Sequence, residues 1–573
     1  MGAQSVSVVI AGSGGAGAIT AGTILLEAAG QAGLYAYMTR SSGAQIRGGE
    51  AVAMVRIASE PIVSHEDHFH LLVAIDWENM GKFAAEMPLA AESLIIGDPD
   101  EGEVPQQIVA SGARQLQIPL KTMAKAIKGG RPNMVALGIV AAMVGLPLDA
   151  FSEVLVKTLK HKGEEALAAS ISGVKAGMET GAGLERIAAL TPSPVASEKR
   201  WNISGNEAAG YGAIRGGVRF VAAYPITPAT EVLEWMAPAL EKVGGVLVQA
   251  EDELASVNQI IGASFGGTPA LTATSGPGLS LMTESIGLAV TSETPVVVVD
   301  VMRGGPSTGI PTKSEQSDLN IAIYGLHGDA PHLVLAPNSI ADCLATMQWA
   351  VHLAETLQTA AIVLSDQAQG QARAIIDRPV ELDFQTRRET AVPRMNGETY
   401  RRYSLTESNV SPMAIPGTPG CQYTADGLEH TQAGVPSSQA ADHQAQLDKR
   451  LRKLIEYDYG ERWADIEGEG DTAVITWGSC TGPSREALRR LRQAGRKGRL
   501  ISIRLLSPAQ PERLARALAG VKRAVVVEQS HGAQFLRYLR AHYDLPFELR
   551  ALHRAGPLPM RPKDIHEQIW NWS

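Results

Sequence analysis

Six short apolar runs, each followed by a turn and a helical pattern, recur between residues 201 and 373. Each run is almost continuously hydrophobic, which is typical of strands in a parallel sheet that helices cover on both faces. The chain has 58 glycines and only 5% aromatic residues, a mix that suits tight strand-to-helix turns better than an aromatic-rich β fold. The sequence therefore predicts a multidomain α/β protein built on parallel sheets. The six expected strands are Arg219–Tyr224, Val246–Ala250, Ala270–Thr274, Pro295–Val301, His332–Ala336 and Ala361–Ser365.

The chain of 573 residues is long enough for several domains of about 150 residues each. We expect an α/β domain over residues 1–190, ended by a Pro- and Ser-rich linker, and a second α/β domain over 201–375. Residues 376–470 are rich in Arg, Pro and Gly and predict an extended connector that ends in a charged helix over Ala440–Tyr457. The βα pattern returns over 471–573. Its expected strands are Ala473–Trp477, Arg499–Ile503 and Ala524–Val527.

Charge and cysteine content exclude several classes of protein. The net charge of −9 gives no overall basic field for nucleic acid. The three cysteines (Cys343, Cys421 and Cys480) lie far apart, so they predict no disulfide framework and cannot alone hold a four-cysteine zinc or iron–sulfur site. Residues 1–11 lack the basic region of a signal peptide, and the longest apolar stretch, Met134–Leu148, is too short to span a bilayer. We therefore expect a cytoplasmic protein that binds neither membrane nor nucleic acid.

A glycine motif stands near the start of the chain. Gly12-Ser-Gly-Gly-Ala-Gly17 lies between an expected strand, Val6–Ala11, and an expected helix, Ile19–Ala29. Such a turn lets backbone N–H groups face a phosphate. A dinucleotide site would also need a carboxylate about 20 residues further on, where Thr39–Ser42 offers none. NAD is therefore disfavoured, and either another phosphate-bearing ligand or a purely structural turn remains. Further on, Arg47 stands between Ile46 and two glycines; alone, such an arginine is more often a surface or salt-bridge residue than a phosphate ligand.

Two motifs of the second domain follow expected strands directly. In Ala223-Tyr-Pro-Ile-Thr-Pro228 two prolines fix the backbone, so Thr227 lies on a rigid loop at a strand's carboxyl end, where open α/β sheets bind ligands. In Gln249-Ala-Glu-Asp-Glu253 three acidic residues begin a helix. They are either partners of the helix dipole or a proton-transfer group at the edge of the sheet.

Two further loops complete this pattern. Thr272-Ala-Thr-Ser-Gly-Pro-Gly278 opens a helix with free N–H groups and predicts an anion or ligand cradle. The segment 300–316 starts on a four-valine strand and continues as a Gly- and Pro-rich loop with Arg303, Thr312 and Lys313. An arginine beside so apolar a strand needs an anionic partner.

Read in order, GNEA, YPITP, QAEDE, TATSGPG and RGGPSTGIPTKSEQ resemble the alpha subunit of the 2-oxoacid:ferredoxin oxidoreductases, especially the 2-oxoglutarate type. GSGGAG and IRGG resemble the gamma subunit of that family, fused in front of the alpha part. WGSC at 477–480 and VEQSHG at 527–532 resemble the transketolase C-terminal-like domain that follows it. The resemblance covers nearly the whole chain.

This resemblance implies thiamine diphosphate (TPP)-dependent oxidative decarboxylation of 2-oxoglutarate to succinyl-CoA and CO2, with CoA as co-substrate and electrons passed singly to ferredoxin. The second domain would be the pyrimidine-binding half of the TPP site. The chain has neither the GDG…N motif of the diphosphate half nor a cysteine cluster. A smaller beta subunit would therefore carry the TPP diphosphate site, Mg²⁺ and a [4Fe-4S] cluster, in a dimer of heterodimers. The direction, oxidative or reductive, stays open.

The resemblance also implies roles for single residues. Glu251 is similar to the family glutamate that hydrogen-bonds the aminopyrimidine ring and so promotes loss of the thiazolium C2 proton. Glu253 is the second candidate, and Asp252 is expected to be a helix cap. Thr227 and Arg303 resemble the residues that orient the 2-oxo and carboxylate groups of the substrate.

Further contacts are expected for a 2-oxoglutarate site. Its distal carboxylate needs a donor beyond Arg303, and the loop after Arg303 offers Thr312 and Lys313, unless the partner chain makes this contact. The remaining expected contacts are Tyr224, Pro225 and Ser275 for TPP, and Gly12, Ser13, Gly14 and Arg47 for CoA.

Three alternatives remain. Within the family, pyruvate or a branched-chain 2-oxoacid could be the substrate. An NAD(P)-dependent dehydrogenase built on the glycine motif belongs to another class, as does a non-catalytic scaffold subunit. The joint presence of Glu251, Thr227 and Arg303 argues against the scaffold, which would need none of them.

Overall fold

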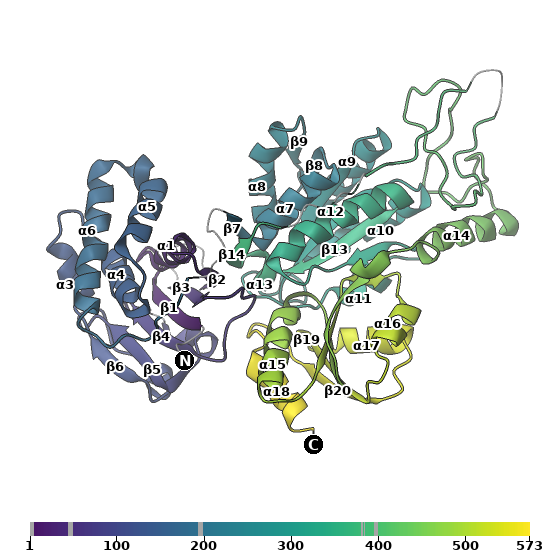
Figure 1. Ribbon diagram of the computed structural model, residues 1–573. Helices are drawn as coiled ribbons and strands as arrows, with labels where there is room; N and C mark the ends of the chain where they lie inside the picture. Colours follow the sequence, from purple (N-terminus) through teal and green to yellow (C-terminus); the bar gives the residue numbers. More distant parts are fainter. Residues whose placement is uncertain are drawn as a thin grey trace. The chain divides into compact units, whose positions relative to one another are not determined.

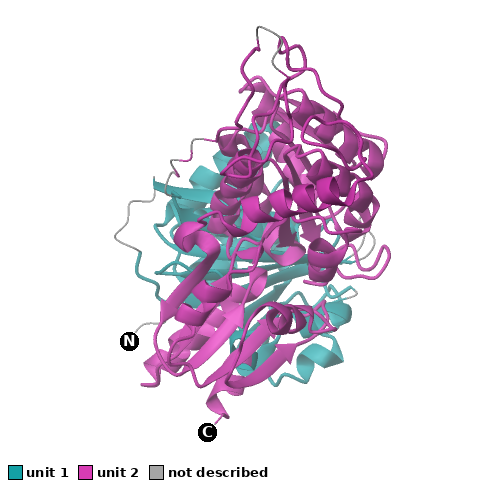
Figure 2. Ribbon diagram, turned by 90° about the vertical axis from the view of Figure 1, so that its right-hand side faces the viewer, with its two compact units in different colours: residues 1–204, 371–379, 560–564 teal, residues 205–370, 380–559, 565–573 magenta. Residues whose placement is uncertain are grey.

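The computed structural model describes residues 5–43, 50–78, 80–192, 199–379, 382, 384, 386–394 and 399–572. They form helices and strands in α/β layers around three sheets (Figure 1). The chain divides into two compact units, coloured separately in Figure 2. Unit 1 comprises residues 1–204, 371–379 and 560–564; unit 2 comprises 205–370, 380–559 and 565–573.

An eight-stranded mixed sheet with the order β6-β5-β4-β1-β3-β2-β14-β7 forms the centre of unit 1. Strand β1 runs parallel to β4 but antiparallel to β3, and β3 separates β1 from β2. The next strand after the glycine motif and α1 is β2, and it does not pair with β1 as it would in a dinucleotide-binding βαβ unit, which weakens the dehydrogenase alternative. The strands are β1 Ser5–Ser13, β2 Tyr35–Ser42, β3 Glu50–Ala58, β4 Phe69–Ala74, β5 Leu89–Gly97, β6 Arg114–Gln117, β7 Arg200–Ser204 and β14 Arg373–Asp377.

The helices of unit 1 include the most apolar stretch of the sequence. It forms α4, which packs against α6 at two glycines: a Cβ added to Gly138 or Gly177 would overlap the backbone of the other helix. This stretch is a buried core helix, and the described part of the chain holds no helix long and apolar enough to cross a membrane. The helices are α1 Ala18–Gln31, α2 Gln106–Val109, α3 Leu120–Lys125, α4 Pro132–Val144, α5 Leu148–Leu159 and α6 Glu164–Gly181, with 3-10 turns at Met80–Glu86 and Lys160–Lys162.

A seven-stranded sheet with the order β18-β12-β13-β11-β10-β8-β9 forms the centre of unit 2. All six strands expected from the apolar runs are present and run parallel, and helices cover both faces of the sheet (Figure 1). The seventh strand, β18, comes from the C-terminal part of the chain and pairs antiparallel with β12. The strands are β8 Phe220–Ala223, β9 Val246–Gln249, β10 Ala270–Thr274, β11 Val296–Met302, β12 Leu333–Leu335, β13 Ala360–Asp366 and β18 Leu505–Ser507.

The helices of this layer follow the predicted motifs. The GNEA motif is the first turn of α7 rather than a segment that precedes it. The helices are α7 Gly205–Gly216, α8 Thr230–Glu241, α9 Glu253–Phe265, α10 Gly276–Thr291, α11 Leu319–Tyr324, α12 Ile340–Leu357 and α13 Gln367–Gly370.

A five-stranded sheet with the order β15-β17-β16-β19-β20 is the second sheet of unit 2. The three strands expected here are present, and β15 and β20 were not expected. The strands are β15 Ala464–Gly468, β16 Thr472–Thr476, β17 Arg499–Ile503, β19 Arg523–Glu528 and β20 Glu548–His553. The helices are α15 Thr481–Gln493, α16 Pro511–Ala517, α17 Gln534–His542 and α18 Pro562–Trp570, with 3-10 turns at Gly460–Trp463 and Gly478–Cys480.

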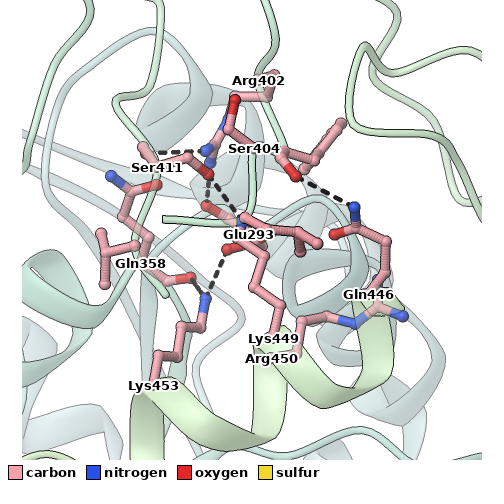
Figure 3. A network of polar contacts seen from close by, with 12 residues as sticks. Glu293, Gln358, Arg402, Ser404, Ser411, Gln446, Lys449, Arg450 and Lys453 are labelled. Atoms are coloured by element: carbon pink, nitrogen blue, oxygen red, sulfur yellow. Dashed lines mark hydrogen bonds and ion pairs between the residues drawn. The ribbon is translucent and has the colours of Figure 1, made fainter. Parts of the chain in front are cut away.

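The predicted connector ends in the predicted charged helix, α14 (Ala440–Ile455), and residues 399–439 form no helix and no strand. Two fully buried lysines of α14 point at Glu293 in the turn before β11 (Figure 3). Lys449 Nζ and Lys453 Nζ lie 2.5 and 2.8 Å from the two carboxylate oxygens. Lys453 also donates to the Gln358 carbonyl, and Arg402 donates to the Glu293 carbonyl, both at 2.8 Å. A buried ion-pair network thus attaches α14 and the connector to the amino-end edge of the seven-stranded sheet.

Candidate active site

Four motif loops meet at the carboxyl-end edge of the seven-stranded sheet. They follow β8, β9, β10 and β11, which are parallel neighbours in that sheet. Parallel strands place their carboxyl ends at the same edge, where open α/β sheets bind ligands. The order of the strands thus brings YPITP, QAEDE, TATSGPG and the Arg303 loop together, although they are spread over about ninety residues of sequence.

The predicted pair Thr227 and Arg303 is in direct contact. Arg303 Nη1 donates to the Thr227 carbonyl at 2.6 Å, although 76 residues separate the two in sequence. The amide of Asn206 donates to the carbonyl of Pro228 at 3.0 Å and holds the next residue of the same loop. The YPITP loop is therefore held from two sides, by the GNEA helix and by Arg303.

Asp318 and Asp300 are the two acids whose charges act on Arg303. Asp300 is fully buried on β11, and Asp318 lies at the start of α11. Burial lowers the pKa of Arg303, and the carboxyls of Asp318 and Asp300 oppose that shift. The sequence offered a signal for Asp300, a charged residue directly after four valines, but none that would have paired it with Asp318.

The three acids of QAEDE have three different environments. Asp252 caps α9 by accepting a hydrogen bond from Ala255 N at 2.7 Å, so the cap prediction is confirmed. Glu251 is exposed, whereas Glu253 is only 7% exposed. Glu251 therefore lies at the open edge of the sheet, and Glu253 lies against the TATSGPG turn.

The TATSGPG loop provides the space beside Glu253. A Cβ added to Gly278 would lie 2.7 Å from Glu253 Oε1 and would overlap the hydroxyl of Thr274. Ser275 is fully buried, and its hydroxyl has no partner within the described parts of the chain. The loop that the sequence predicts as a cradle is a close-packed turn, and because Gly278 has no side chain it leaves room for the Glu253 carboxylate.

The loop after Arg303 folds back on itself. Gly304 N donates to the Lys313 carbonyl at 2.9 Å, and Ile310 N donates to the Gly304 carbonyl at 2.8 Å. Gly309 has φ of 56°, and a Cβ there would overlap the Gly304 carbonyl, so the turn requires glycine. The fold-back brings half-buried Thr312 and Lys313 next to the residue that follows Arg303.

The C-terminal motifs hold the base of this loop through Gln316. Gln316 Nε2 donates to the Trp477 carbonyl at 3.0 Å, and Gln529 N donates to Gln316 Oε1 at 2.9 Å. The buried Cys480 thiol also donates to Gln316 Oε1. WGSC and VEQSHG thus support the loop structurally, a role that could not be read from their spacing.

Four exposed large apolar side chains, called the apolar rim, belong to the motif loops and to the helices that follow them. They are 41% to 51% exposed and come from the YPITP loop, the first turn of α9, the second turn of α10 and the Arg303 loop. Large apolar side chains gathered at one edge are typical of a surface that a partner covers. The rim residues are Tyr224, Leu254, Leu281 and Ile310, and the predicted TPP contact Pro225 is half-buried beside Tyr224.

In unit 1 the glycine motif opens onto a cleft of about 1230 Å³. Ser13 lies on its wall and donates from its backbone N and its hydroxyl to Asp76, at 2.9 and 2.8 Å. Gly12 is buried and Gly14 is exposed, and neither lines the cleft. The predicted Arg47 lies outside the described residues. The cationic side chains that line the cleft were not predicted; they are Lys121, Lys128, Arg131 and Lys162.

The described residues offer no group of three or more His, Cys, Asp or Glu side chains that could hold a metal ion. All three cysteines are buried on separate segments. Burial raises the pKa of Cys343 and of Cys480 well above the usual range, so these thiols stay protonated.

Two protein-family models match this chain. The family model described as pyruvate flavodoxin/ferredoxin oxidoreductase, thiamine diphosphate-binding, matches residues 211–449. The model described as pyruvate ferredoxin/flavodoxin oxidoreductase matches residues 7–180.

Curated relatives and a solved structure extend the match. The 2-oxoglutarate synthase subunit KorA of Methanothermobacter marburgensis is 35% identical over 64% of this chain and 97% of its own. The 2-oxoglutarate oxidoreductase subunit KorA of Mycobacterium tuberculosis is 35% identical over 72% of this chain, which spans 64% of that relative. The 2-oxoglutarate:ferredoxin oxidoreductase of Magnetococcus marinus, solved with 2-oxoglutarate, coenzyme A and succinyl-CoA bound, is 36% identical with a TM-score of 0.91 and covers 99% of both chains. The resemblance seen in the motifs is thereby confirmed: this chain belongs to the 2-oxoacid:ferredoxin oxidoreductase family.

Proposed function

We propose that this chain is the alpha-type subunit, with a fused gamma-type domain, of a 2-oxoglutarate:ferredoxin oxidoreductase. The reaction converts 2-oxoglutarate, CoA and two oxidised ferredoxins into succinyl-CoA, CO2, two reduced ferredoxins and a proton. The observation that carries the proposal is the contact of Arg303 with the Thr227 loop beside a buried glutamate, all at one edge of the sheet. A relative solved with 2-oxoglutarate and succinyl-CoA supports the choice of substrate.

The described residues fit half of a TPP site. Glu253 offers a shielded carboxylate, and the space beside it exists because Gly278 lacks a side chain. When bound, the cofactor would supply the carbon nucleophile and the electron sink for loss of CO2. The Glu251 carboxylate, exposed at the edge of the sheet that the second subunit would cover, would hydrogen-bond its aminopyrimidine ring and favour the tautomer that removes the C2 proton. Glu253, buried beside Gly278, stays the second candidate. Tyr224, Pro225 and Ser275 are proposed around the same ring.

Arg303 and Thr227 would orient the substrate. A guanidinium presents two parallel N–H donors, which match the two oxygens of a carboxylate. Nε of Arg303 is shielded from solvent and has no hydrogen-bond partner among the described residues, so a donor is left over for the substrate. The Thr227 hydroxyl, on a loop that Arg303 itself holds, would face the 2-oxo group.

Thr312 and Lys313 would select between 2-oxoacids. 2-Oxoglutarate carries a second carboxylate that pyruvate lacks, so a site that prefers it needs a further donor. The fold-back of the loop brings both residues next to the turn that follows Arg303. If neither these two residues nor the second subunit contacts the distal carboxylate, pyruvate or a branched-chain 2-oxoacid is the alternative substrate.

A second, smaller subunit would complete the site. The exposed apolar rim around the four loops supports an interface there, and relatives are named as single subunits. This partner would contribute the TPP diphosphate site, Mg²⁺ and the [4Fe-4S] cluster, because the sequence lacks GDG…N and a cysteine cluster. We propose a dimer of heterodimers that reduces ferredoxin in the cytoplasm.

The cleft in unit 1 would take CoA. Four cationic side chains line a cavity that is large enough for a nucleotide, next to a glycine turn at the start of α1. Cationic side chains are the usual partners of the phosphates of CoA. Ser13, with Gly12 and Gly14 in the same turn, and Arg47 remain proposed contacts.

The test is co-expression of this chain with a neighbouring gene product that carries GDG…N and a cysteine cluster, followed by anoxic purification. CoA-dependent viologen reduction should be fastest with 2-oxoglutarate in a panel of 2-oxoacids, and this chain alone should be inactive. Substantial turnover by this chain alone would contradict the two-chain site. Formation of NADH without CoA would favour the dehydrogenase instead.

A further inference from the structure

The Arg303 loop, residues 303–318, is held near its end by the chain that follows β19. Gln316 N donates to the Gln529 carbonyl at 2.7 Å, and Gln529 N donates in return to Gln316 Oε1 at 2.9 Å. The side chain of Gln529 reaches a second residue of the loop, because its Nε2 donates to the Ser314 carbonyl at 3.3 Å. Gln316 and Gln529 are both buried, so these hydrogen bonds are shielded from water.

Gln534 makes two further contacts, at the point where the loop becomes α11. Its Nε2 donates to the Ser317 carbonyl at 2.7 Å, and its Oε1 accepts from Asn320 N at 2.9 Å. A primary amide carries a donor and an acceptor side by side, so one glutamine can bridge a carbonyl and an N–H group of the same segment. The end of the loop and the first turn of α11 are thus held by one side chain.

The two glutamines stand on a rigid base. Gln529 directly follows β19, and Gln534 is the first residue of α17. Between them the chain is fixed by Glu528, which is 1% exposed and accepts from Phe535 N at 2.9 Å and from Leu536 N at 3.0 Å. A buried carboxylate that accepts from the free N–H groups at the start of α17 fixes that helix to the end of β19.

Glu315 extends this support to the residues next to Arg303. Glu315 is 8% exposed, and its two carboxylate oxygens accept from two different segments. Oε1 accepts from Gly556 N, and Oε2 accepts from Gly305 N, both at 3.3 Å. The turn that follows Arg303 and the C-terminal segment are therefore joined through one buried carboxylate.

Thr312 and Lys313 lie between these supports. Both are half-buried, and the Lys313 carbonyl accepts from Gly304 N at 2.9 Å. The next residue, Ser314, is the one that Gln529 holds. The backbone that carries Thr312 and Lys313 is therefore fixed on one side by the turn at Gly304 and on the other by the glutamine contacts.

We propose that Gln529 and Gln534 are positioning residues for the Arg303 loop and thereby set the preference for 2-oxoglutarate over pyruvate. The inference rests on the proposed function, because it takes Thr312 and Lys313 as donors to the distal carboxylate. Loss of one partner leaves a carbonyl of the loop unsatisfied, so the loop leaves its position. Arg303 is held separately, by β11 and by the YPITP loop, so the contact with the first carboxylate is retained.

Two substitutions at Gln534 separate its contact with the loop from its contact with α11. Gln534→Met removes both contacts, whereas Gln534→Glu keeps an acceptor for Asn320 N but turns an oxygen toward the Ser317 carbonyl. In the co-expressed complex, both variants should lower the ratio of kcat/KM for 2-oxoglutarate to that for pyruvate by at least about fivefold. The kcat/KM for pyruvate should stay within about threefold of wild type. Gln493→Met, at an exposed glutamine that ends α15, is the matched control and should keep the ratio.

Two further measurements test whether the effect passes through the loop. Hydrogen–deuterium exchange of peptides within residues 304–318 of the complex should be faster in Gln534→Met, because the amides of Gly304, Ile310 and Gln316 are donors there. This measurement does not depend on turnover. Lys313→Ala already lacks a distal donor, so adding Gln534→Met to it should lower the ratio no further.

A wild-type ratio in Gln534→Met, or in Gln534→Glu alone, would overturn the positioning role. A further loss when Gln534→Met is added to Lys313→Ala would also overturn it, because the two residues would then act independently. Equal losses with both 2-oxoacids would indicate a general structural defect and contradict it as well. If the wild-type complex turns over no 2-oxoacid, the proposed function itself is wrong. A complex that uses 2-oxoglutarate, with an unchanged ratio in Gln534→Met, contradicts the positioning role alone.

Discussion

Arg303 and Thr227 lie 76 residues apart in the sequence, yet Nη1 of the arginine donates to the threonine carbonyl at 2.6 Å. The contact exists because β8 and β11 flank β10 in a parallel sheet, so the loops that follow them leave the same edge. It connects the loop that would orient the 2-oxo group with the cation that would bind the carboxylate. A change at either residue should therefore weaken substrate binding more than it slows C2 proton exchange of bound TPP.

Arg303→Lys should weaken 2-oxoacid binding while the fold is retained. Lysine keeps the charge but loses the planar pair of donors. A charged hydrogen bond contributes roughly 1.5–3 kcal/mol, so kcat/KM for 2-oxoglutarate should fall about 10- to 150-fold. Steady-state kinetics of the complex measure this, and C2 exchange of TPP serves as the control that should not change. An unaltered kcat/KM would mean that another residue binds the carboxylate.

Glu251→Gln should slow C2 exchange of bound TPP by roughly 10²- to 10⁴-fold, the usual contribution of an acid–base group. Glutamine keeps the volume of the side chain but lacks the carboxylate. Glu253→Gln is the matched variant in the same motif, and we expect near wild-type exchange for it. The reverse pattern in the NMR measurement would identify Glu253 as the acid–base residue.

Thr312→Ala or Lys313→Ala should reduce the preference for 2-oxoglutarate over pyruvate by at least about tenfold. The distal carboxylate would lose a donor, whereas pyruvate never used it. The ratio of the two kcat/KM values is the measurement, since a general loss of activity cancels in it. If both variants keep the wild-type ratio, the second subunit makes the distal contact.

Arg131→Ala should raise the KM for CoA roughly threefold to tenfold, with little change in the KM for the 2-oxoacid. Arg131 lines the unit 1 cleft, so its loss removes a positive charge from the walls. Lys175→Ala is the control, because Lys175 is an exposed lysine on α6 that does not line the cleft. Arg47→Ala should act like Arg131→Ala if the glycine loop also contacts CoA. Equal changes in both KM values would indicate structural roles.

Glu293→Gln should release the connector from the sheet. Burial disfavours the charged form of Glu293, but Lys449, Lys453 and Arg402 outweigh it and lower its pKa. Without the carboxylate two lysines stay buried without a counter-charge, a loss of about 3–5 kcal/mol. Limited proteolysis within residues 399–439 should then be faster than in wild type.

The control for this experiment is Glu469→Gln, which removes an exposed ion pair to Lys497. An exposed pair is screened by solvent and contributes little to stability, so cleavage should proceed at the wild-type rate. Equal cleavage of the Glu293 and wild-type chains would show that the network does not hold the connector.

The sequence by itself determined the elements of the catalytic half-site. Continuous apolar runs predicted all six parallel strands of the seven-stranded sheet, because a strand buried on both faces has no polar side to alternate with. The Gly- and Pro-rich motifs after those runs predicted the loops, because backbone restriction is a local property. Arg303, which follows a strand with four valines, predicted an acidic partner, because burying an unpaired charge is costly in any fold.

Only the tertiary structure decided which residues meet. Glu251 and Glu253 are two positions apart and of the same residue type, and the packing of α9 against α10 exposes one and buries the other. Asp318 lies against the first turn of α10, more than forty residues earlier in the sequence, only because Gly276 has no side chain. The role of Gln316 between WGSC and VEQSHG likewise joins segments more than 160 residues apart. Local pattern specifies strands and turns, whereas burial and charge pairing depend on contacts between distant segments, which no single stretch of sequence contains.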